Sequence, residues 1–322
     1  MPDTGPSATP PVTLADIQAA AERIAGRVRR TPMLEAVALK DPPTPARLLL
    51  KLENLQVIGA FKARGATNAL LSLDDDQVAR GIITASGGNH GLAVAYAGWQ
   101  AKTRAVIYLS ENVPAAKADK LRAWGAEVRV EGPVWDDANR AALAAAEAEG
   151  LTYIHPFADP AVIAGQGTLG LEIAEQAPDS DIVLVAIGGG GLISGVGTAI
   201  EALLPKARVI GIEPVGAPTL KTSLAAGSPV PLERVESRAV TLAPRQSAQI
   251  NLDIIARTVE EIVLISDEEM REAARWLWFE LGIAVELSAA AAIAALQTGR
   301  VVAPAGSNVT AVICGAGSDG IA

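Results

Sequence analysis

One lysine of this sequence lies where its side chain could react as an amine. Lys62 stands in the segment 58–66 (IGAFKARGA), among apolar residues and glycines. Burial in such surroundings disfavours the charged ammonium, which lowers the pKa of the lysine and frees the amine for nucleophilic chemistry. A solvated lysine on a helix surface is the alternative that this segment alone leaves open. Lys62 is therefore a candidate nucleophile.

A run of four glycines could bind an anion. Gly188, Gly189, Gly190 and Gly191 follow a strand-like apolar run and precede a stretch of helical character. Backbone N–H groups without neighbouring side chains can approach an anion closely, and the N-terminus of the next helix adds a favourable dipole. The alternative is a tight turn that needs glycine at only one or two positions. No Gly-Lys-Ser/Thr follows, so the run is not a P-loop.

A second loop of this kind is the segment 86–91 (SGGNHG). Its backbone amides, at the start of an expected helix, could hold a carboxylate, and Ser86 and Asn89 would add hydrogen-bonding groups. A helix N-cap followed by a turn explains the same residues equally well. His90, taken alone, is typical of a packing or capping histidine. This loop is a candidate substrate site only in combination with other features.

The cysteine and histidine content limits other chemistry. Cys314 is the only cysteine, which excludes an intrachain disulfide and a thiolate metal cluster. His90 and His155 are the only histidines, which argues against a histidine-based zinc site.

The composition indicates a globular enzyme rather than a nucleic-acid-binding or membrane protein. The chain has 322 residues, of which 50% are hydrophobic, and carries a formal net charge of −9. That charge disfavours nucleic acid or an anionic membrane as a partner. No apolar run approaches the ~18 residues of a transmembrane helix. Residues 1–12 are expected to form a flexible tail and not a signal peptide, so we expect a cytoplasmic location.

Apolar runs of strand length alternate with stretches of helical periodicity. Strands are expected at 48–52, 81–85, 104–109, 127–130, 151–154, 181–187, 209–212 and 309–314. Helices are expected at 13–28, 136–149 and 267–281. Two more are expected, one that begins at about residue 91 and one that follows the four glycines and ends at 204. Thr13 and Ser266 open the helices 13–28 and 267–281 as capping boxes. The alternation predicts an α/β fold with mostly parallel sheets, in two lobes with a cleft between them.

The order of the motifs resembles that of one enzyme family. The segments 51–56 (KLENLQ) and 59–66 (GAFKARGA) are similar to the lysine motif of the threonine/serine dehydratases, which are fold-type II pyridoxal-phosphate (PLP) enzymes related to the serine racemases. Further similar segments follow in the family's order: 86–91, 155–157 with 162–168, 188–195 and 211–214. The resemblance covers nearly the whole chain beyond the tail. It implies a tryptophan-synthase-β-like fold with helices on both faces of its sheets.

The resemblance implies a role for each cofactor residue. Lys62 would form the Schiff base with PLP and, once released, act as the base that removes the Cα proton. Phe61 would pack beside the cofactor ring, and Asn89 would hydrogen-bond its 3′-hydroxyl. The glycines 188–191 would hold its phosphate. Cys314 would face the pyridine nitrogen as a neutral thiol, which leaves that nitrogen unprotonated and favours β-elimination. The alternative interpretation is that Cys314 is a small, buried hydrophobic residue on a strand with no role at the cofactor.

The substrate residues and the domain limits follow from the same resemblance. Ser86, Gly87, Asn89 and His90 would line the site of the substrate carboxylate, largely through backbone N–H groups. Residues 1–70 and 159–322 would form the large cofactor-binding domain, and 71–158 the small domain with the asparagine loop. The reaction would convert a β-hydroxy amino acid such as L-threonine or L-serine into a 2-oxo acid and ammonium.

The sequence also departs from the family in three places. Gly87 stands where serine racemases carry a second acid/base serine, so racemisation is disfavoured. Glu213 and the carbonyl of Ala217 match part of a Mg²⁺ or Ca²⁺ site, but Thr219 replaces an acidic ligand. The sequences of the segments 286–290 and 314–318 differ from the motifs usual in the family. A dehydratase for phenylserine or 3-hydroxyaspartate is therefore an alternative, followed by a racemase and by a non-catalytic PLP-binding protein.

We expect a homodimer or a higher homo-oligomer. Trp276 and Trp278 on the helix 267–281 could lie at an interface, although core burial is the preferred explanation of both.

Overall fold

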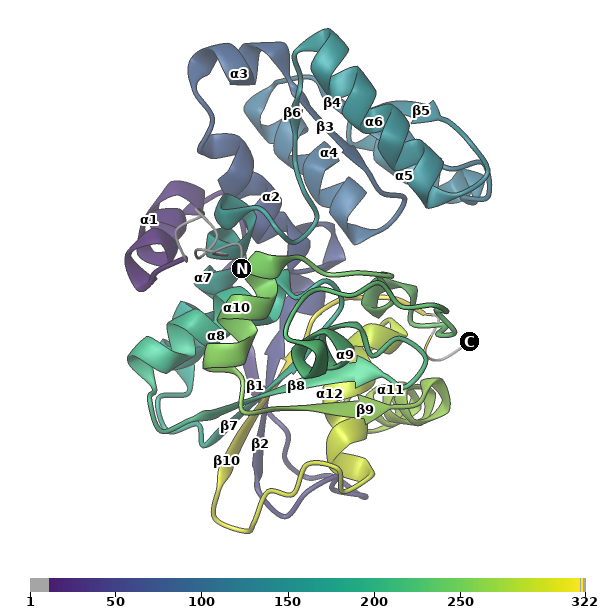
Figure 1. The fold of residues 1–322 in the computed structure, drawn as a ribbon. Coiled ribbons are helices and arrows are strands. Elements are labelled where there is room, and N and C mark those ends of the chain that lie inside the picture. The colour runs from purple at the N-terminus through teal and green to yellow at the C-terminus, as the bar shows by residue number, and fades with distance from the viewer. Residues whose placement is uncertain (1–11, 319, 321–322) are drawn as a thin grey trace, which may run out of the picture.

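Two β-sheets, each with its own helices, organise the chain (Figure 1). The computed structural model describes residues 12–318 and 320. The predicted tail 1–12 therefore lies outside the described residues except for Val12, which is 3% exposed. Val12 is thus part of the packed chain and not of a flexible tail, while residues 1–11 lie outside the described part.

The larger sheet has six strands in the order β1-β2-β10-β7-β8-β9. Its strands are β1 (Met33–Glu35), β2 (Arg47–Leu52), β7 (Ile182–Ala186), β8 (Arg208–Pro214), β9 (Glu261–Ile265) and β10 (Asn308–Ile313). All neighbouring pairs are parallel except β1 and β2, which are antiparallel. Every residue of β7 is buried, as expected for a strand whose sheet is covered on both faces.

The smaller sheet has four parallel strands in the order β5-β4-β3-β6. They are β3 (Ile82–Ala85), β4 (Ala105–Leu109), β5 (Glu127–Val130) and β6 (Thr152–Tyr153). All four come from the sequence between 82 and 153, so this sheet is local in the chain. The larger sheet draws its strands from both sides of this segment. The exact domain limits at 70 and 159 stay a prediction.

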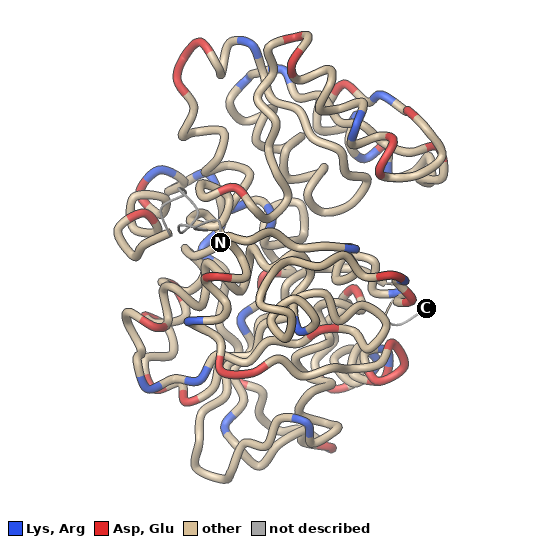
Figure 2. The backbone as a smooth tube through the Cα atoms, in the orientation of Figure 1, with Lys and Arg blue, Asp and Glu red and all other residues tan. Residues whose placement is uncertain are grey.

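The described part of the chain forms helices on both sheets. They are α1 (Leu14–Ile24), α2 (Lys62–Leu71), α3 (Asp75–Arg80), α4 (Asn89–Ala101), α5 (Ala115–Ala123), α6 (Trp135–Glu149), α7 (Pro160–Gln176), α8 (Gly191–Leu203), α9 (Thr219–Ala226), α10 (Gln249–Thr258), α11 (Asp267–Leu281) and α12 (Leu287–Gln297), with the short 3₁₀ helices η1 (Glu53–Leu55), η2 (Val57–Gly59) and η3 (Val240–Leu242). Basic and acidic residues are interspersed along the backbone of both lobes (Figure 2).

Local sequence signals explain several helix boundaries. The capping boxes at Thr13 and Ser266 are both present. The first helix nevertheless ends at Ile24 and not at the predicted Val28, because the chain turns at Gly26, whose φ is +73°. α12 is predominantly apolar around its circumference and is buried from 287 to 296, which is the expected place for such a helix.

Three loops that matter for function follow the carboxyl ends of parallel strands. The segment 86–88 follows β3, the glycines 188–190 follow β7, and Cys314 follows β10. Ligands of open α/β folds bind beyond the carboxyl ends of their strands. The fold therefore directs the loops of both sheets toward the region between the lobes.

Candidate active site

Lys62 is the first residue of α2, and the chain before it is tightly constrained. Ile58 and Gly59 both have positive φ, at 61° and 82°. The Phe61 amide donates to the Cys314 carbonyl at 3.2 Å, which ties the start of α2 to the end of β10. The Lys62 Nζ donates to the carbonyl of Pro156 at 2.6 Å and lies 5.2 Å from the centroid of the Phe61 ring. The lysine therefore lies between the two lobes.

The surroundings of Lys62 change its acidity in the predicted direction. Burial lowers the pKa of Lys62 to about 8, although nearby Cys314 and Glu286 act in the opposite direction. The side chain keeps partial solvent contact and is not sealed in the core. Near neutral pH the amine is consequently deprotonated far more often than that of an ordinary lysine, as a nucleophile or base requires.

The four glycines have a packing reason that the sequence did not reveal. A Cβ at Gly188 would lie 2.6 Å from the carbonyl oxygen of Thr241, and one at Gly191 would lie 2.8 Å from that of Phe157. At Gly189 a Cβ would overlap the ring of Phe157. Gly190 has a φ of +96° and is the N-cap of α8. The loop is thus free of side chains at a helix N-terminus, where the first amides have no partner within the helix.

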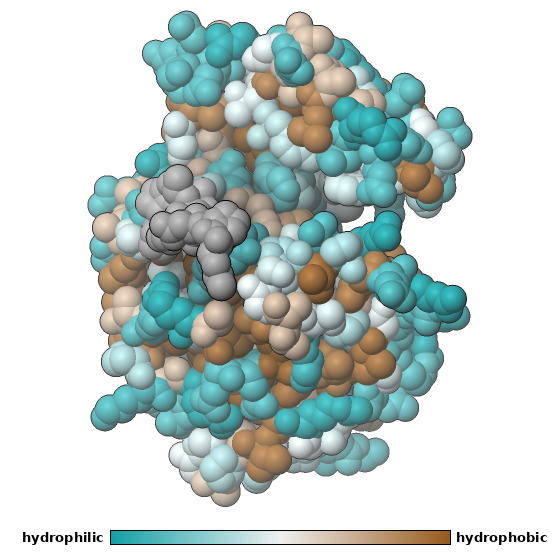
Figure 3. All heavy atoms as spheres, viewed as in Figure 1, coloured by the Kyte–Doolittle hydropathy of each residue, from teal (hydrophilic) through white to brown (hydrophobic). Residues whose placement is uncertain are grey.

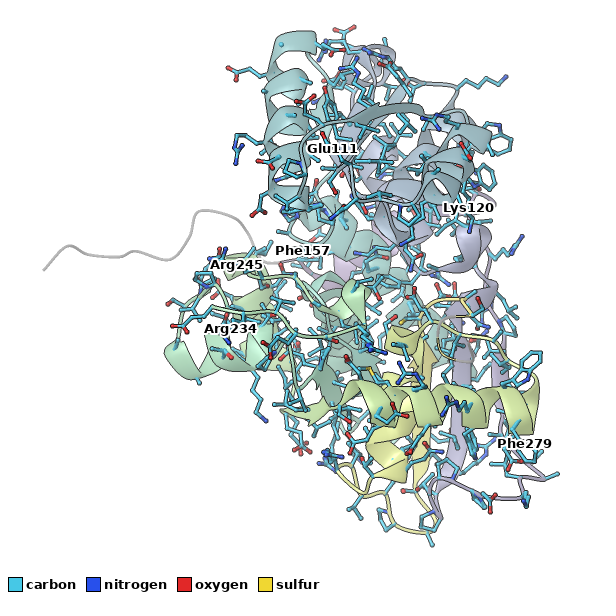
Figure 4. All side chains as sticks on the ribbon, turned by 90° about the vertical axis from the view of Figure 1, so that its right-hand side faces the viewer. Glu111, Lys120, Phe157, Arg234, Arg245 and Phe279 are labelled. Carbon is cyan, nitrogen blue, oxygen red and sulfur yellow. The ribbon has the colours of Figure 1, made fainter. Side chains whose placement is uncertain are left out.

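Phe157 connects this loop to the lysine. It follows Pro156, whose carbonyl accepts the Lys62 hydrogen bond, and its own atoms border Gly189 and Gly191. Phe157 lies at the level between the two lobes (Figure 4). The surface between the lobes is notched on the right-hand side of Figure 3. The lysine and the glycine loop therefore belong to one site.

The loop 86–88 contributes backbone more than side chains. The Gly88 amide donates to the Ser86 hydroxyl at 3.3 Å, and the loop residues keep partial exposure. A Cβ at Gly87 would lie 2.9 Å from a methyl of Val113. A serine could therefore enter this position only if Val113 moved.

His90 is a packing residue by its contacts. It is 5% exposed, and its Nε2 lies 2.9 Å from the carbonyl oxygen of Ile154. Burial, followed by the charge of Lys62, lowers the pKa of His90 to about 3. The ring is therefore neutral at physiological pH and donates its Nε2–H to Ile154. Its predicted place at the substrate carboxylate depends on the backbone at the start of α4.

Asn89 contacts a residue to which the sequence analysis assigned no role. Its Nδ2 lies 3.1 and 3.0 Å from the two carboxylate oxygens of Glu286, the N-cap residue of α12. The charge of Glu286 also acts on Lys62 and on Cys314. A charged residue directly before a predominantly apolar helix was the available signal, because such a residue must end either in solvent or in a polar site.

Cys314 is buried at the end of β10. It is 3% exposed, and its Sγ lies 3.9 Å from the hydroxyl of Ser288. Burial, reinforced by the charge of Glu286, raises the pKa of the Cys314 thiol. The group is therefore a neutral thiol. Its orientation toward a pyridine nitrogen stays a prediction.

The predicted cation ligands do not suit a hard cation. Both Glu213 carboxylate oxygens accept backbone N–H groups of α9, from Leu220 at 2.7 Å and Lys221 at 2.9 Å. The Thr219 hydroxyl, in place of an acidic ligand, donates to Pro244 at 2.7 Å. Within residues 12–318 and 320, no cluster of three or more His, Cys, Asp or Glu side chains could hold a metal ion.

These groups fit pyridoxal phosphate by their chemistry. An amine of lowered pKa suits its aldehyde, amides at a helix N-terminus suit its phosphate, an amide side chain suits its hydroxyl and a neutral thiol suits its ring nitrogen. They come from four separate segments, represented by Lys62, Gly188–Gly191, Asn89 and Cys314.

The comparison with known families agrees with this chemistry. A model of the pyridoxal-phosphate dependent enzymes matches residues 24–315, and the chain belongs to this family. The predicted cofactor and fold class are thereby confirmed.

Individual relatives extend the likeness over nearly the whole chain. The L-threonine ammonia-lyase of Thermotoga maritima is 37% identical over 285 residues, which are 88% of this chain and 71% of that protein. The phenylserine dehydratase of Ralstonia pickettii is 38% identical over 313 residues, 95% of this chain and 94% of that protein. The structure of maize serine racemase superposes with a TM-score of 0.90 at 32% identity, covering 94% of this chain and 93% of that one.

Proposed function

We propose that the protein is a PLP-dependent dehydratase, a carbon–nitrogen lyase that converts a β-hydroxy amino acid such as L-threonine or L-serine into a 2-oxo acid and ammonium. The observation that carries the proposal is Lys62, a partly buried amine of lowered pKa beside the glycine loop of a PLP enzyme. The relatives named as a threonine ammonia-lyase and a phenylserine dehydratase support the same reaction class.

Each group of site residues has its own role in the proposed reaction. PLP, when bound, supplies the electron sink for the charge left at Cα. The Lys62 amine takes the Cα proton, because a neutral amine with a pKa near 8 is an effective base close to neutral pH. The amides of the glycine loop hold the phosphate, and those of the loop 86–88 hold the substrate carboxylate. In net terms the Cα proton and the β-hydroxyl leave as one water, and a second water then hydrolyses the unsaturated product to the 2-oxo acid and ammonium.

Gly87 favours elimination over racemisation. A racemase needs a second proton donor on the face of the substrate opposite the lysine, and glycine has none to offer. Val113 occupies the space into which a Cβ at this position would extend. One-base chemistry at Lys62 is therefore the proposed course.

The test is a panel of four amino acids. Purified protein with PLP is given L-threonine, L-serine, phenylserine and 3-hydroxyaspartate, and the 2-oxo acid is measured. We expect release with at least one of them and none with Lys62→Ala. Bound cofactor without any oxo acid from the panel would refute the lyase and leave a binding protein.

A preference for phenylserine is the second candidate. The phenylserine dehydratase of Ralstonia pickettii matches along almost its full length, so its substrate is as well supported by similarity as threonine is. The comparison of kcat/KM for phenylserine and threonine separates the two.

We propose a cytoplasmic protein on the basis of its composition. Within the described residues, no helix is long and apolar enough to cross a bilayer. We also propose a homodimer or a higher homo-oligomer. Trp276 is buried as expected, but Trp278 is 52% exposed, so core burial was wrong for Trp278. Phe279 beside it is 69% exposed and projects outward at the edge of Figure 4. Sedimentation velocity of the wild type and of Phe279→Glu tests this surface.

A further inference from the structure

Trp135, the first residue of α6, places its indole at the carboxyl edge of the small sheet. In β3, the carbonyl of Ile83 accepts the amide of Ile154 at 2.9 Å, on the side of β6. Carbonyls two residues apart on a strand point the same way, so the carbonyl of Ala85 points past the end of β6. The Trp135 Nε1–H donates to that carbonyl at 2.9 Å. The indole therefore lies beside the chain that continues from Ile154.

That chain carries the contacts of Lys62. The carbonyl of Pro156 accepts the Lys62 hydrogen bond, and Phe157 borders the glycine loop. On its other side, the carbonyl that Trp135 contacts leads directly into the loop 86–88. Trp135 is thus placed between the segment that positions the amine and the loop proposed for the substrate carboxylate. It is 48% exposed, so much of the indole surface is open to a ligand.

Apolar side chains from both lobes border the same region. Val113, in the loop after β4, lies against Gly87, where a Cβ would be 2.9 Å from one of its methyl groups. From the large lobe, the ring of Phe157 lies against Gly189 and stays partly exposed (Figure 4). Small-molecule sites are lined mostly by apolar and aromatic side chains, with a few polar groups that fix the orientation. Trp135 adds an aromatic group on the side of the small lobe.

The amine of Lys62 has no second cation beside it. Burial and the charge of Lys62 lower the pKa of His155 to about 4 and that of His90 to about 3, so both rings are neutral near neutral pH. The carboxylate of Glu286, by contrast, acts to raise the pKa of Lys62. Within residues 12–318 and 320, no arginine and no second lysine acts on any of these three pKa values. The site therefore offers no guanidinium to a second carboxylate on the substrate.

The first turn of α6 adds acidic groups next to the indole. Asp136 and Asp137 follow Trp135 directly. Arg140, one turn further along the helix, donates to Asp137 at 3.1 Å, so its charge is paired. Like charges that face each other in a binding site disfavour the complex. A substrate with a second carboxylate is therefore disfavoured on this side as well.

We propose that Trp135 is a specificity-determining residue: its indole forms the small-lobe wall of the site for the β-substituent, which selects a neutral, apolar substituent, an aromatic ring included, and rejects a carboxylate. The inference rests on the proposed dehydratase function and narrows its substrates. Threonine and phenylserine fit such a site, whereas 3-hydroxyaspartate does not. A phenyl substituent would gain the additional contact between two aromatic rings.

The test uses amino acids that resemble the substrates but carry no β-hydroxyl. L-Phenylalanine, L-alanine, L-asparagine and L-aspartate can bind without being dehydrated, and the change in cofactor absorbance of the holoenzyme gives each dissociation constant. Asparagine and aspartate have nearly the same shape and differ in charge. We expect the wild type to bind asparagine about 10-fold more tightly than aspartate, because the carboxylate meets like charges. Phenylalanine should bind more tightly than alanine.

Three variants separate contact with the substituent from support of the loop 86–88. Trp135→Ala should weaken phenylalanine binding about 5- to 10-fold, the effect of one aromatic contact, and change alanine binding by less than about twofold. Trp135→Phe keeps a ring without the indole N–H and should retain most of the phenylalanine affinity. Trp99→Ala is the matched control, because Trp99 is a tryptophan of the same lobe with 57% exposure, and it should match the wild type.

Three results would overturn the proposal. They are equal binding of aspartate and asparagine, phenylalanine bound no more tightly than alanine, and equal effects of Trp135→Ala on phenylalanine and alanine. The last result would mean that Trp135 only supports the loop 86–88. If Trp135→Ala does not fold, Trp135→Leu takes its place and is judged by the same two affinities. The proposed function fails separately: a holoenzyme that releases no oxo acid from any β-hydroxy amino acid loses the lyase assignment, while the binding order of the four amino acids still tests the site.

Discussion

Arg64 holds α2, the helix that begins with Lys62, to the rest of the large lobe through a buried group of charges. Its guanidinium donates to both carboxylate oxygens of Glu53, at 2.8 and 2.7 Å, and to Glu172 at 2.7 Å. Lys51 completes the group with a bond to Glu172 at 2.6 Å. Arg64 is 1% exposed, while Lys51 and Glu53 are fully buried. Two positive and two negative charges thus balance in the interior.

Arg64→Met removes one cation and leaves the two carboxylates facing a single lysine. Breaking a buried ion pair by removing one partner costs about 3–5 kcal/mol, because the remaining charge has lost its compensation. For 322 residues, an unfolding entropy of about 2.1 cal/mol/K per residue converts ~4 kcal/mol into a fall of roughly 6 °C in the melting temperature. Arg64→Met combined with Glu53→Leu restores the balance and should recover part of this loss.

Circular dichroism during thermal and urea unfolding, with PLP held at one concentration, measures the change. The matched control is Arg30→Met, which breaks an ion pair to Glu175 on α7 whose partners are 55% and 64% exposed. Such surface pairs contribute about 0–1 kcal/mol. Equal effects of Arg64→Met and Arg30→Met on the free energy of unfolding would refute the reasoning. So would a double variant less stable than Arg64→Met alone.

Three further results are expected. Reconstitution of cofactor-stripped protein should accelerate with rising pH and level off above the Lys62 pKa of about 8, since the neutral amine is the nucleophile; stopped-flow absorbance measures this, and a rate that still rises at pH 10 would contradict it. The folded protein disfavours protonation of His90, whose pKa of about 3 lies below its ordinary 6.5, so stability present above pH 6.5 should be lost as the pH falls toward 3. His90→Gln should lose less stability than the wild type on acidification. Melting temperatures of both proteins at pH 7.5 and 5 measure this, and equal losses in the two proteins would contradict it. Gly189→Ala should weaken PLP binding, because its methyl would overlap Phe157; fluorescence titration tests this, and wild-type affinity would show that the loop can yield.

Much of the site could be predicted from consecutive residues. The segment around Lys62, the loop 86–91 and the run of four glycines are local patterns, and their order indicated the family and the cofactor. Buried strands such as β7 and the capping boxes at Thr13 and Ser266 are local signals too, and the structure contains them. Such features depend on backbone geometry and on near neighbours, so a short stretch of sequence suffices to predict them.

Other features exist only because the fold joins distant segments. Glu286 meets Asn89 across 197 positions, and Lys51 meets Glu172 across 121. A glutamate or lysine has the same letter in the sequence whether it is solvated or paired in the interior, and only tertiary packing decides which.

The glycine run and Lys62 show both contributions together. The sequence indicated an anion loop from four missing side chains, whereas the structure adds that Phe157 and Thr241 leave no room for a Cβ there. It likewise indicated that Lys62 could be a desolvated amine. Only the assembled lobes place that amine against Pro156, near Glu286 and Cys314. The identity of the reactive groups is thus determined by the sequence, whereas their acidity and orientation arise from the residues that tertiary folding places around them.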